Sequence, residues 1–431
     1  GRSRCPWTST GAGNDDIGRR KEMARAVSTG LDLRRLTADR PPVMLFDVGL
    51  DLIRPFALAS IPVIAANLDP ATLSWVSRYP VGRLALPPST DPDADSIQVL
   101  MNAGAEIVGV LGRKIPLCYG LDETLRLLYE HGDELSRHYL FLVNDPALAS
   151  ALLYKDAFGA LCRSKGLPVP RMFGWDPDSL DSIARADCPV LVKPTHKTDW
   201  HTSAVYREIF AGGGKAKIFA SGRELMSDAL CSKYRDLLVA QEYIPGGDDE
   251  IYSFHGFADR TSQILAYFCG KKIRTFPRNI GESTYLELVK SADLEAVGRR
   301  IISTLGFKGV FKIDFKRHAG TGRFYMLEIN ARFNLWHYLG AVSGVNLPAV
   351  AYRYLVHGIR PPADNYSTRY RWLDLYLDSK AYRELRSRGE LSGAQWLRSL
   401  AFHRNVCSTF SWADPKPSLV WWARALKKKL A

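Results

Sequence analysis

The stretch Gly309–Arg332 reads GVFKIDFKRHAGTGRFYMLEINAR and has the pattern of a β-hairpin. Apolar and polar residues alternate on both sides of the glycine-flanked turn Gly320–Gly322. Successive side chains of a strand point to opposite faces, so centring the turn on Thr321 puts Asp314 directly across from Glu328. Opposed residues of an antiparallel pair have Cβ atoms about 4.5–5.5 Å apart. The hairpin therefore predicts two carboxylates side by side.

Two facing carboxylates repel each other unless a cation lies between them or one is protonated. The same count puts Lys312 opposite Asn330, so an amide also lies on this face. Oxygen ligands from Asp314, Glu328 and Asn330 suit Mg²⁺, which also takes ligands from substrate phosphates. A solvated strand face with alternating charges would give the same pattern, so the hairpin alone leaves both interpretations open.

Composition narrows the class of protein. The 431 residues are 46% hydrophobic and 24% charged, which favours a globular protein of several domains. Lys and Arg number 58 against 45 Asp and Glu, a net charge of +13 that predicts an anionic partner: nucleic acid, acidic lipid or nucleotide phosphate. The seven cysteines form no CxxC pair, so neither a zinc site nor a disulfide framework is predicted, and a cytoplasmic location is expected. We expect neither a transmembrane helix nor a cleavable signal, because charges interrupt every long apolar stretch.

The pattern of elements predicts an α/β protein with four regions. Residues 1–40 show no sustained apolar period and are expected to be a poorly ordered lead-in. Residues 41–145 alternate the apolar runs VMLFDVG, IPVIAANL, IVGVLG and YLFLVN with helical stretches, which predicts an α/β domain. Residues 146–360 form a second α/β region that ends with the hairpin. Residues 361–431 carry Trp, Tyr, Leu and Arg at helical spacing and predict a helical extension.

Helix boundaries in the second region carry local signals. Asp145 followed by Pro146 predicts a helix start, and Gly166 predicts its end. Ser221 and Glu224 have the spacing of a capping box, which predicts another helix start.

Further motifs precede the hairpin in a fixed order. Lys155 lies on a predicted helix before Gly166–Pro168, and Lys193 lies in the predicted strand PVLVKP. The glycine run GGGKAKIFASGREL begins at Gly212, and AQEYIPGGDDE begins at Ala240. Together with LEINAR in the hairpin, this order resembles ATP-grasp enzymes of the carboxylate–amine ligase type, in particular the bacterial ligases that include D-aspartate ligase.

The resemblance covers roughly residues 41–360 and implies an ATP-grasp fold, an α/β (α+β) architecture in which two subdomains grip ATP. A Rossmann-like pre-ATP-grasp domain would occupy residues 41–145, the ATP-grasp domain residues 146–360, and a helical extension residues 361–431. The implied cofactors are ATP and Mg²⁺, with Mn²⁺ as an alternative metal.

The resemblance also implies roles for single residues. Asp314, Glu328 and Asn330 stand at the positions of the magnesium ligands. Arg332, Lys272 and Arg274 stand where the transferred phosphate or an acyl phosphate would be held. The implied ATP-binding residues are Lys155, Lys193, Gly212, Gly213, Gly214, Lys215, Lys217, Gln241, Glu242, Ile244, Glu250 and Lys312. Asp249 is an alternative to Glu250 for the ribose.

Each of these positions also has an ordinary explanation. Glycines lack Cβ atoms and so let backbone N–H groups approach phosphate, but most glycine runs are flexible turns. Lysines near strand ends are usually solvated. Lys272 and Arg274, at alternate positions, could form a basic edge strand that discourages aggregation.

Two segments depart from the family pattern. THKTDWHTSAVYREIFA, which carries His196, Trp200 and His201, is longer than a minimal loop and predicts either a substrate-gating insertion or a surface excursion. The segment FNLWHYLGAVSGVNLP follows Arg332. Its Asn334, Trp336 and His337 are candidates for shaping an acceptor site, although a buried helix start would equally explain Trp336.

Three functions remain open from the sequence. The first is an ATP-dependent ligase that joins a small carboxylate to an amine, such as an amino acid or peptide, through an acyl phosphate. The second is an ATP-grasp carboxylase or carbamoyl-type enzyme that uses bicarbonate. The third is a non-enzymatic basic binder, because SLVWWARALKKKLA has the profile of an interfacial helix. No nucleic-acid motif is recognised, so no nucleic-acid partner is expected, and a homodimer is compatible with the sequence.

Overall fold

The structure is a computed structural model that describes residues 31–69, 71–87, 92–153, 155–175, 177–195, 204–210, 216–278, 281–360 and 365–430. These residues form two compact units. Unit 1 holds the described residues up to Phe141, together with Tyr352–Gly358 and those from Trp412 onward. Unit 2 holds the described residues of Leu142–Ala351 and Ile359–Ser411.

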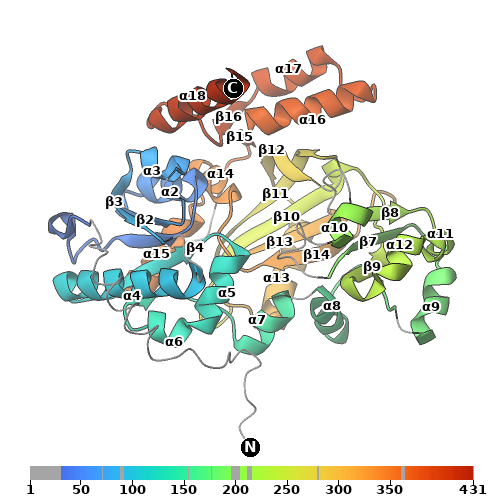
Figure 1. The fold of residues 1–431 in the computed structure, drawn as a ribbon, viewed down its shortest axis with the longest axis horizontal. Coiled ribbons are helices and arrows are strands. Elements are labelled where there is room, and N and C mark those ends of the chain that lie inside the picture. The colour runs from blue at the N-terminus through green and yellow to red at the C-terminus, as the bar shows by residue number, and fades with distance from the viewer. Residues whose placement is uncertain are drawn as a thin grey trace, which may run out of the picture. The chain divides into compact units, whose positions relative to one another are not determined.

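Unit 1 is built on a five-stranded parallel sheet with the order β3-β2-β1-β4-β5. Its strands are β1 (Val43–Phe46), β2 (Val63–Asn67), β3 (Pro80–Ala85), β4 (Ile115–Tyr119) and β5 (Tyr139–Leu140). The helices are η1 (Leu33–Arg35), α2 (Leu50–Leu58), α3 (Leu73–Val76), α4 (Pro92–Leu111), α5 (Asp122–Glu130), α6 (Gly132–Leu135) and α18 (Lys416–Leu430). In Figure 1, α2 and α3 are drawn above the strands and α4 and α6 below them. Every residue of β1, β2 and β4 is buried, as expected of a parallel sheet covered on both faces. The predicted N-terminal α/β architecture is confirmed.

One predicted strand of this unit is wrong. The run Ile107–Gly112 was expected to be a buried strand, but Ile107 to Leu111 form the end of α4. Ile107 and Leu111 are buried four residues apart, while Val110 is 55% exposed, which is the pattern of one helix face. A short apolar run does not distinguish a buried strand from a buried helix segment. The strand begins later, at Ile115.

Unit 2 contains a larger sheet of seven strands with the order β14-β13-β10-β11-β12-β15-β16 (Figure 1). Its strands are β10 (Ile251–Ala258), β11 (Ile264–Phe276), β12 (Glu282–Val289), β13 (Gly309–Arg317), β14 (Phe324–Asn330), β15 (Tyr370–Leu373) and β16 (Arg404–Cys407). All neighbouring pairs are antiparallel except β15 and β16. A second sheet of four strands has the order β6-β9-β7-β8, with β6 (Met172–Phe173), β7 (Val190–Pro194), β8 (Lys217–Phe219) and β9 (Leu238–Glu242).

The helices of unit 2 carry the predicted boundary signals. They are α7 (Pro146–Leu153), α8 (Lys155–Ser164), α9 (Pro177–Ala184), α10 (Ala204–Ile209), α11 (Gly222–Ser227), α12 (Ala229–Lys233), η3 (Arg235–Leu237), η4 (Asp248–Glu250), α13 (Ala292–Leu305), α14 (Trp336–Val342), α16 (Leu375–Ser387) and α17 (Gly393–Ala401), while α15 (Leu347–His357) is divided between the units. Gly166 has a φ of 61°, which favours glycine and ends the helix. Ser221 Oγ accepts from the Glu224 N–H at 3.3 Å, so the predicted cap of α11 is confirmed.

The predicted register of the hairpin is confirmed. Asp314 pairs with Glu328, and Lys312 pairs with Asn330. Beyond Asp314 the register shifts by one residue, so that Phe315 pairs with Met326. The shift lies on the turn side of the facing carboxylates and leaves their pairing intact.

The C-terminal region contains the predicted helices α16, α17 and α18, together with two strands that were not predicted. β15 pairs with β12, and β16 pairs with β15, so both extend the larger sheet. These strands have only four residues each, too few for a clear alternation. Within the described residues, no helix has the length and apolar character needed to cross a membrane.

Candidate functional site

The facing residues of β13 and β14 form a tight polar cluster. Lys312 Nζ lies 2.7 Å from Asp314 Oδ2. The Asn330 side-chain amide donates to Asp314 Oδ2 at 3.3 Å and to Glu328 Oε1 at 3.1 Å. Asp314 is 6% exposed, and its Oδ1 has no hydrogen-bond partner among the described residues. A buried carboxylate oxygen without a donor costs free energy, so this cluster is incomplete on its own.

The cluster fits a divalent cation with oxygen ligands. Among the described residues there is no group of three or more His, Cys, Asp or Glu side chains that could hold a metal, so the candidate ligands are two carboxylates and an amide. Mg²⁺ commonly binds proteins through one or two carboxylates and completes its shell with water and phosphate oxygens. A half-turn of the Asn330 amide would present its oxygen where the nitrogen now lies. The orphaned Asp314 Oδ1 favours this interpretation.

The same face of the sheet continues onto β10 through residues that the sequence analysis did not single out. Ser253 pairs with Asp314, and His255 pairs with Lys312. His255 Nε2 lies 2.9 Å from Ser253 Oγ. The alternation in IYSFHGF contained this signal, because it puts both polar side chains on the face opposite Phe254.

The Trp336 side chain packs against this face of the sheet, next to His255 and Gly270. Trp336, at the start of α14, is 1% exposed, so the structure agrees with the alternative of a buried helix start. A Cβ at Gly270 would clash with the Trp336 ring, so only glycine leaves room for the indole. The His255 ring lies 5.0 Å from the Trp336 ring and stacks on Phe268 at 4.6 Å.

Two buried histidines adjoin the cluster. The rings of His255 and His337 lie 6.3 Å apart edge to face, and both residues are 0% exposed. Burial, and then the charge of Lys312, lowers the pKa of His337 to about 3 and the pKa of His255 well below its usual value. His255 Nδ1, His337 Nε2 and Asn334 Nδ2 have no hydrogen-bond partner in the described part of the chain. With Asp314 Oδ1, they concentrate unsatisfied polar atoms next to the carboxylates.

Lys272 of β11 faces the same cluster, whereas Arg274 does not. Burial lowers the pKa of Lys272, and the Asp314 carboxylate opposes that shift. The expectation that Lys272 and Arg274 together hold the transferred phosphate is corrected, because the register of β11 against β12 shifts between the two residues. Lys272 pairs with Leu286 and Arg274 pairs with Tyr285, so the two side chains leave on opposite faces.

The Arg274 guanidinium is held in a buried ion pair. Its Nε and Nη2 donate to the two oxygens of Asp378 at 2.8 and 2.9 Å, and its Nη1 donates to Ser399 Oγ at 3.1 Å. Asp378 is 0% exposed and also accepts from Thr284 Oγ1 and Trp396 Nε1. Each of the three Arg274 nitrogens donates to a partner inside unit 2, so Arg274 is not a candidate for holding an acyl phosphate.

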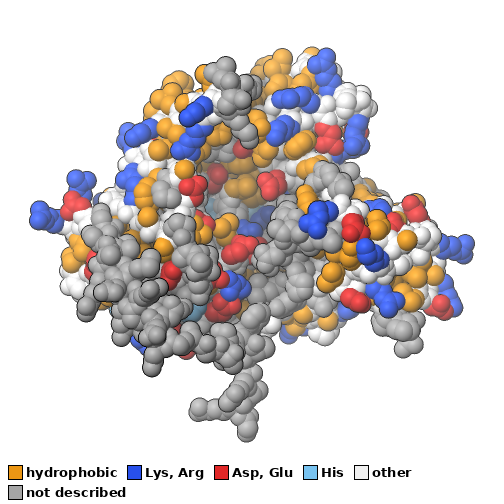
Figure 2. Space-filling model, viewed as in Figure 1, with side chains coloured by type: hydrophobic (Ala, Val, Ile, Leu, Met, Phe, Trp, Pro, Cys, Tyr) orange, Lys and Arg blue, Asp and Glu red, His pale blue; other side chains and the backbone are white. Residues whose placement is uncertain are grey.

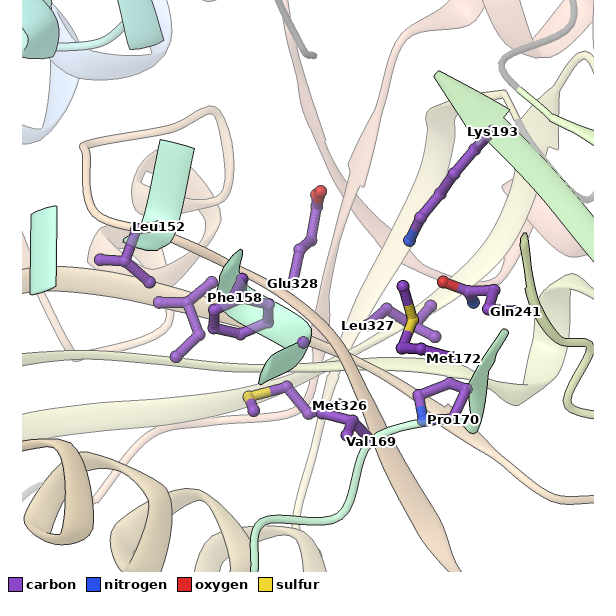
Figure 3. A pocket seen from close by; sticks show the side chains of 12 residues that line it. Leu152, Phe158, Val169, Pro170, Met172, Lys193, Gln241, Met326, Leu327 and Glu328 are labelled. Atoms are coloured by element: carbon purple, nitrogen blue, oxygen red, sulfur yellow. The ribbon is translucent and has the colours of Figure 1, made fainter. Parts of the chain in front are cut away.

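An apolar slot lies between the two sheets of unit 2. Its lining residues are Leu152, Phe158, Gly159, Val169, Pro170, Met172, Lys193, Gln241, Met326, Leu327, Glu328 and Ile329. Figure 3 shows the Lys193 side chain extending from β7 toward Gln241 and Leu327, while the Glu328 side chain rises on the other side of Leu327. The slot therefore has apolar walls with one cation and one carboxylate at its border.

Hydrogen bonds from Arg171 and Lys316 hold the linker after β9, up to Gly247, in place. Gln241 and Ile244 are 5% and 3% exposed. The Glu242 N–H donates to the Arg171 carbonyl oxygen at 2.8 Å, and the Glu242 carboxylate pairs with the Arg171 side chain at 3.3 Å. Lys316 Nζ donates to the carbonyl oxygens of Gly246 and Gly247 at 2.7 and 2.5 Å. The linker backbone is therefore fixed beside the slot.

The two ribose candidates differ in their surroundings. Both Glu250 oxygens accept from Arg317, at 2.7 and 3.0 Å, and this pairing holds the pKa of Glu250 below its usual value. Asp249 is exposed. A ribose at Glu250 would therefore share the carboxylate with Arg317.

The structure does not bring Lys217 to the candidate phosphate site. Lys217 pairs with Val192, whose side chain is 0% exposed in the core of the small sheet, so Lys193 points to the opposite face. Lys217 Nζ forms an ion pair with Asp228 at 2.6 Å. The prediction that Lys217 binds ATP is therefore corrected to a structural pair at a sheet edge.

Several predicted residues lie outside what the structure describes. Gly212, Gly213, Gly214 and Lys215 are outside the described residues, as are His196, Trp200 and His201. Lys155 begins α8, but its side chain is not among those described. Arg332 follows β14 and is half-buried. The site in hand therefore comprises the β13–β14 cluster, Lys272 and the slot that Lys193 borders.

This combination of a small antiparallel sheet, a larger sheet with facing carboxylates and a slot between them is an ATP-grasp fold, and solved structures agree. A biotin carboxylase from Campylobacter jejuni superposes with a TM-score of 0.54 at 12% identity, covering 74% of this chain and 72% of that one. An L-amino acid ligase from Bacillus licheniformis has a TM-score of 0.50 at 14% identity, covering 74% and 75%. The predicted fold is thereby confirmed.

Sequence comparisons find similarity to ATP-grasp proteins over part of the chain. Residues 260–375 match a family model described as ATP-grasp in the biosynthetic pathway with Ter operon. D-aspartate ligase of Enterococcus faecium (strain Aus0004) is 20% identical over 270 residues, which are 60% of this chain and 63% of that protein. The match thus spans less than two thirds of that relative's length. The chain is thus similar in sequence to ATP-grasp proteins over part of its length, and it has their fold.

Proposed function

We propose that the chain is an ATP-dependent carboxylate–amine ligase. The γ-phosphoryl group of ATP would pass to an oxygen of a substrate carboxylate, which yields ADP and an acyl phosphate. An amine would then attack the acyl carbon, form the amide bond, lose a proton and release phosphate. The proteins that this chain resembles in sequence and fold include a D-aspartate ligase and an L-amino acid ligase, so an amino acid is the proposed class for one substrate.

The observation that carries the proposal is the incomplete cluster beside the slot. Asp314, Glu328 and Asn330 put three oxygen-bearing side chains on one face, and a buried Asp314 oxygen lacks a donor. Glu328 also borders the slot that Lys193 enters (Figure 3). A nucleotide with its base in the slot would extend its phosphates toward these carboxylates, where a cation is required.

The residues of the cluster would have two roles, metal binding and charge balance. Asp314, Glu328 and Asn330 would hold Mg²⁺, or Mn²⁺ in its place. When bound, the metal neutralises phosphate charge and aligns the phosphate oxygens for transfer. Lys312 balances the charge of Asp314 across 2.7 Å and keeps that carboxylate in place.

Cations around the cluster would receive the transferred group. Lys193 would bind phosphate oxygens at the slot, and Lys272 and Arg332 would hold the acyl phosphate as charge develops on it. Gln241 and Ile244 would meet the base edge, and Glu250 or Asp249 the ribose. The family resemblance assigns further phosphate contacts to Lys155, Gly212, Gly213, Gly214 and Lys215.

The direct test is a screen for ADP release. Purified protein would be incubated with ATP and Mg²⁺ against pools of amino acids, and the products would be analysed by mass spectrometry. The expected result is Mg²⁺-dependent ADP release that requires both a carboxylate and an amine, with a product that has lost one water relative to its two substrates.

A parallel assay with bicarbonate distinguishes a ligase from the main alternative, a carboxylase. Carboxylases share this fold, so ATP hydrolysis that bicarbonate stimulates in the absence of any amine would replace the ligase proposal with a carboxylase. If no pool stimulates ADP release and ATP does not bind, the enzymatic proposal is refuted.

A further inference from the structure

The C-terminal helix α18 exposes an apolar stripe that unit 1 does not cover. Leu419, Trp422 and Leu426 are 66%, 62% and 60% exposed, and they are spaced three and four residues apart on one helix face. Trp412, just before the helix, is 87% exposed. A soluble surface seldom shows several large apolar side chains at such exposure side by side, and such groups mark interaction sites.

The helix is firmly attached by its other face. Asp414 is 0% exposed and accepts from Ser77 Oγ at 2.7 Å and from the Arg78 N–H at 3.0 Å. Ser418 is buried, and Arg424 donates to the Ala71 carbonyl oxygen. The apolar stripe therefore belongs to a helix whose orientation within unit 1 is fixed.

Basic side chains flank the stripe. At 100° per residue, Lys416 and Lys427 lie along one edge of the stripe, about 60–80° from Leu419, and both are exposed. In Figure 2, hydrophobic and basic side chains lie next to one another over the part of the face that α18 occupies.

This pairing of charges and apolar groups selects one occupant. A contact with a second copy would bring together two chains of net charge +13 through surfaces that both carry exposed lysines, which opposes association. A nucleic acid would satisfy the cations and stack on Trp422, but it offers no apolar region to Leu419 and Leu426. An anionic bilayer surface offers both phosphate charge and acyl chains at the depth that Trp and Leu reach.

We infer that α18 is a docking helix for the surface of an anionic lipid bilayer. The stripe Leu419, Trp422, Leu426 inserts at the boundary between headgroups and acyl chains, together with Trp412. Lys416 and Lys427 contact the lipid phosphates. The inference does not depend on the proposed ligase activity, because it concerns unit 1 and its readout is membrane binding.

Co-sedimentation of the full chain with vesicles tests it. One set of vesicles contains phosphatidylglycerol and phosphatidylcholine in equal amounts, and the other contains phosphatidylcholine alone. The expected result is binding to the anionic vesicles at least about tenfold stronger than to the neutral ones. Raising NaCl from about 0.1 M to about 1 M shortens the Debye length from about 10 Å to about 3 Å and should remove this preference.

Two variants separate the contributions. Leu419→Ser/Trp422→Ser/Leu426→Ser should weaken binding to anionic vesicles by about a hundredfold or more, since each apolar side chain loses its insertion. Lys416→Glu/Lys427→Glu should weaken it by at least about tenfold and make it insensitive to phosphatidylglycerol. The matched control is Leu58→Ser/Val110→Ser, which removes apolar side chains of 58% and 55% exposure elsewhere in unit 1 and should leave binding unchanged.

Each remaining outcome overturns the inference. If the triple serine variant has the wild-type circular dichroism and melting temperature and binds vesicles as the wild type does, the stripe is not a membrane contact. If the wild type binds no vesicles but forms a dimer that the triple variant disrupts, the stripe is an interface between copies. Salt-dependent binding to single-stranded DNA, without vesicle binding, would assign the basic flank to nucleic acid.

Discussion

The larger sheet of unit 2 contains two buried groups of charges that differ in one respect. On one face, Arg274 and Asp378 form an ion pair in which Ser399, Thr284 and Trp396 satisfy the remaining atoms. On the other, Asp314 retains an oxygen without a donor and faces a second carboxylate, Glu328. A completed network adds to stability, whereas an incomplete one is where a ligand or ion would bind. The difference separates a structural cluster from a candidate functional one.

The largest effect is expected from Glu328→Gln. This change preserves shape but removes one charged ligand of the proposed metal, so Mg²⁺-dependent ADP release should fall by about a thousandfold. The free energy of unfolding should change by less than about 1 kcal/mol, because the carboxylate repulsion is relieved as the ligand is lost. Initial rates measure the ADP release, and urea denaturation measures the free energy of unfolding. The control Glu282→Gln, at an exposed strand end, should retain the wild-type rate, and equal rates for both variants would remove Glu328 from the metal site.

The second prediction concerns the Arg274–Asp378 ion pair, where a substitution should lower stability and leave the rate unchanged. Asp378→Asn leaves the Arg274 guanidinium buried without its counter-charge, so the free energy of unfolding should fall by about 3 kcal/mol. The rate per folded molecule should stay near the wild-type value. The exposed pair Arg185–Asp181 offers the control, because Asp181→Asn should cost less than about 1 kcal/mol. Comparable losses of stability for Asp378→Asn and Asp181→Asn would contradict the idea that burial makes the Arg274–Asp378 pair more important.

The third prediction compares neighbours on one strand. Lys272→Met should lower ADP release by about a hundredfold, since a cation aimed at the cluster is lost. Lys271→Met, whose side chain lies over the Tyr252 ring on the opposite face, should lower it by less than about threefold. Steady-state rates at saturating ATP provide the measurement. Similar losses at both positions would contradict the assignment of faces along β11.

The smallest expected effect concerns pH. Unfolded His337 titrates near 6.5 and folded His337 near 3, so the unfolded chain binds more protons between these values. Stability from this group is complete above about pH 6.5 and declines as the pH falls toward 3. Between pH 7 and pH 5 the loss is about 2 kcal/mol. His337→Gln should flatten the pH dependence by this amount in urea denaturation. Parallel curves for the wild type and His337→Gln would show that His337 is not buried in its neutral form.

The sequence predicted the fold where a pattern was local. The alternation around Thr321 was sufficient for the Asp314–Glu328 register, and glycine at position 166 for the end of a helix. The prediction of a strand at Ile107–Gly112 was wrong, because four apolar residues within five positions suit a strand and a buried helix alike.

The candidate site was predictable only in part. Asp314, Glu328 and Asn330 share one hairpin, so their proximity follows from counting. The separation of Lys272 from Arg274 depends on a register shift against β12, which leaves no mark in the sequence of β11. Lys217 was misassigned because its partner Asp228 lies on a different element, and no local rule joins the two.

The register shift in β11 also cancels itself. The pairing of β11 with β12 shifts by one residue after Lys272 and shifts back after Arg274, so Thr275 pairs with Ser283 in the register that Lys272 had. The two strands therefore have the same register before Lys272 and after Arg274, and only Arg274 lies on the face opposite to the one that this register predicts. A relative aligned to this chain by strand register alone would match correctly at Lys272 and Thr275, yet its residue at position 274 would be assigned to the wrong face of the sheet.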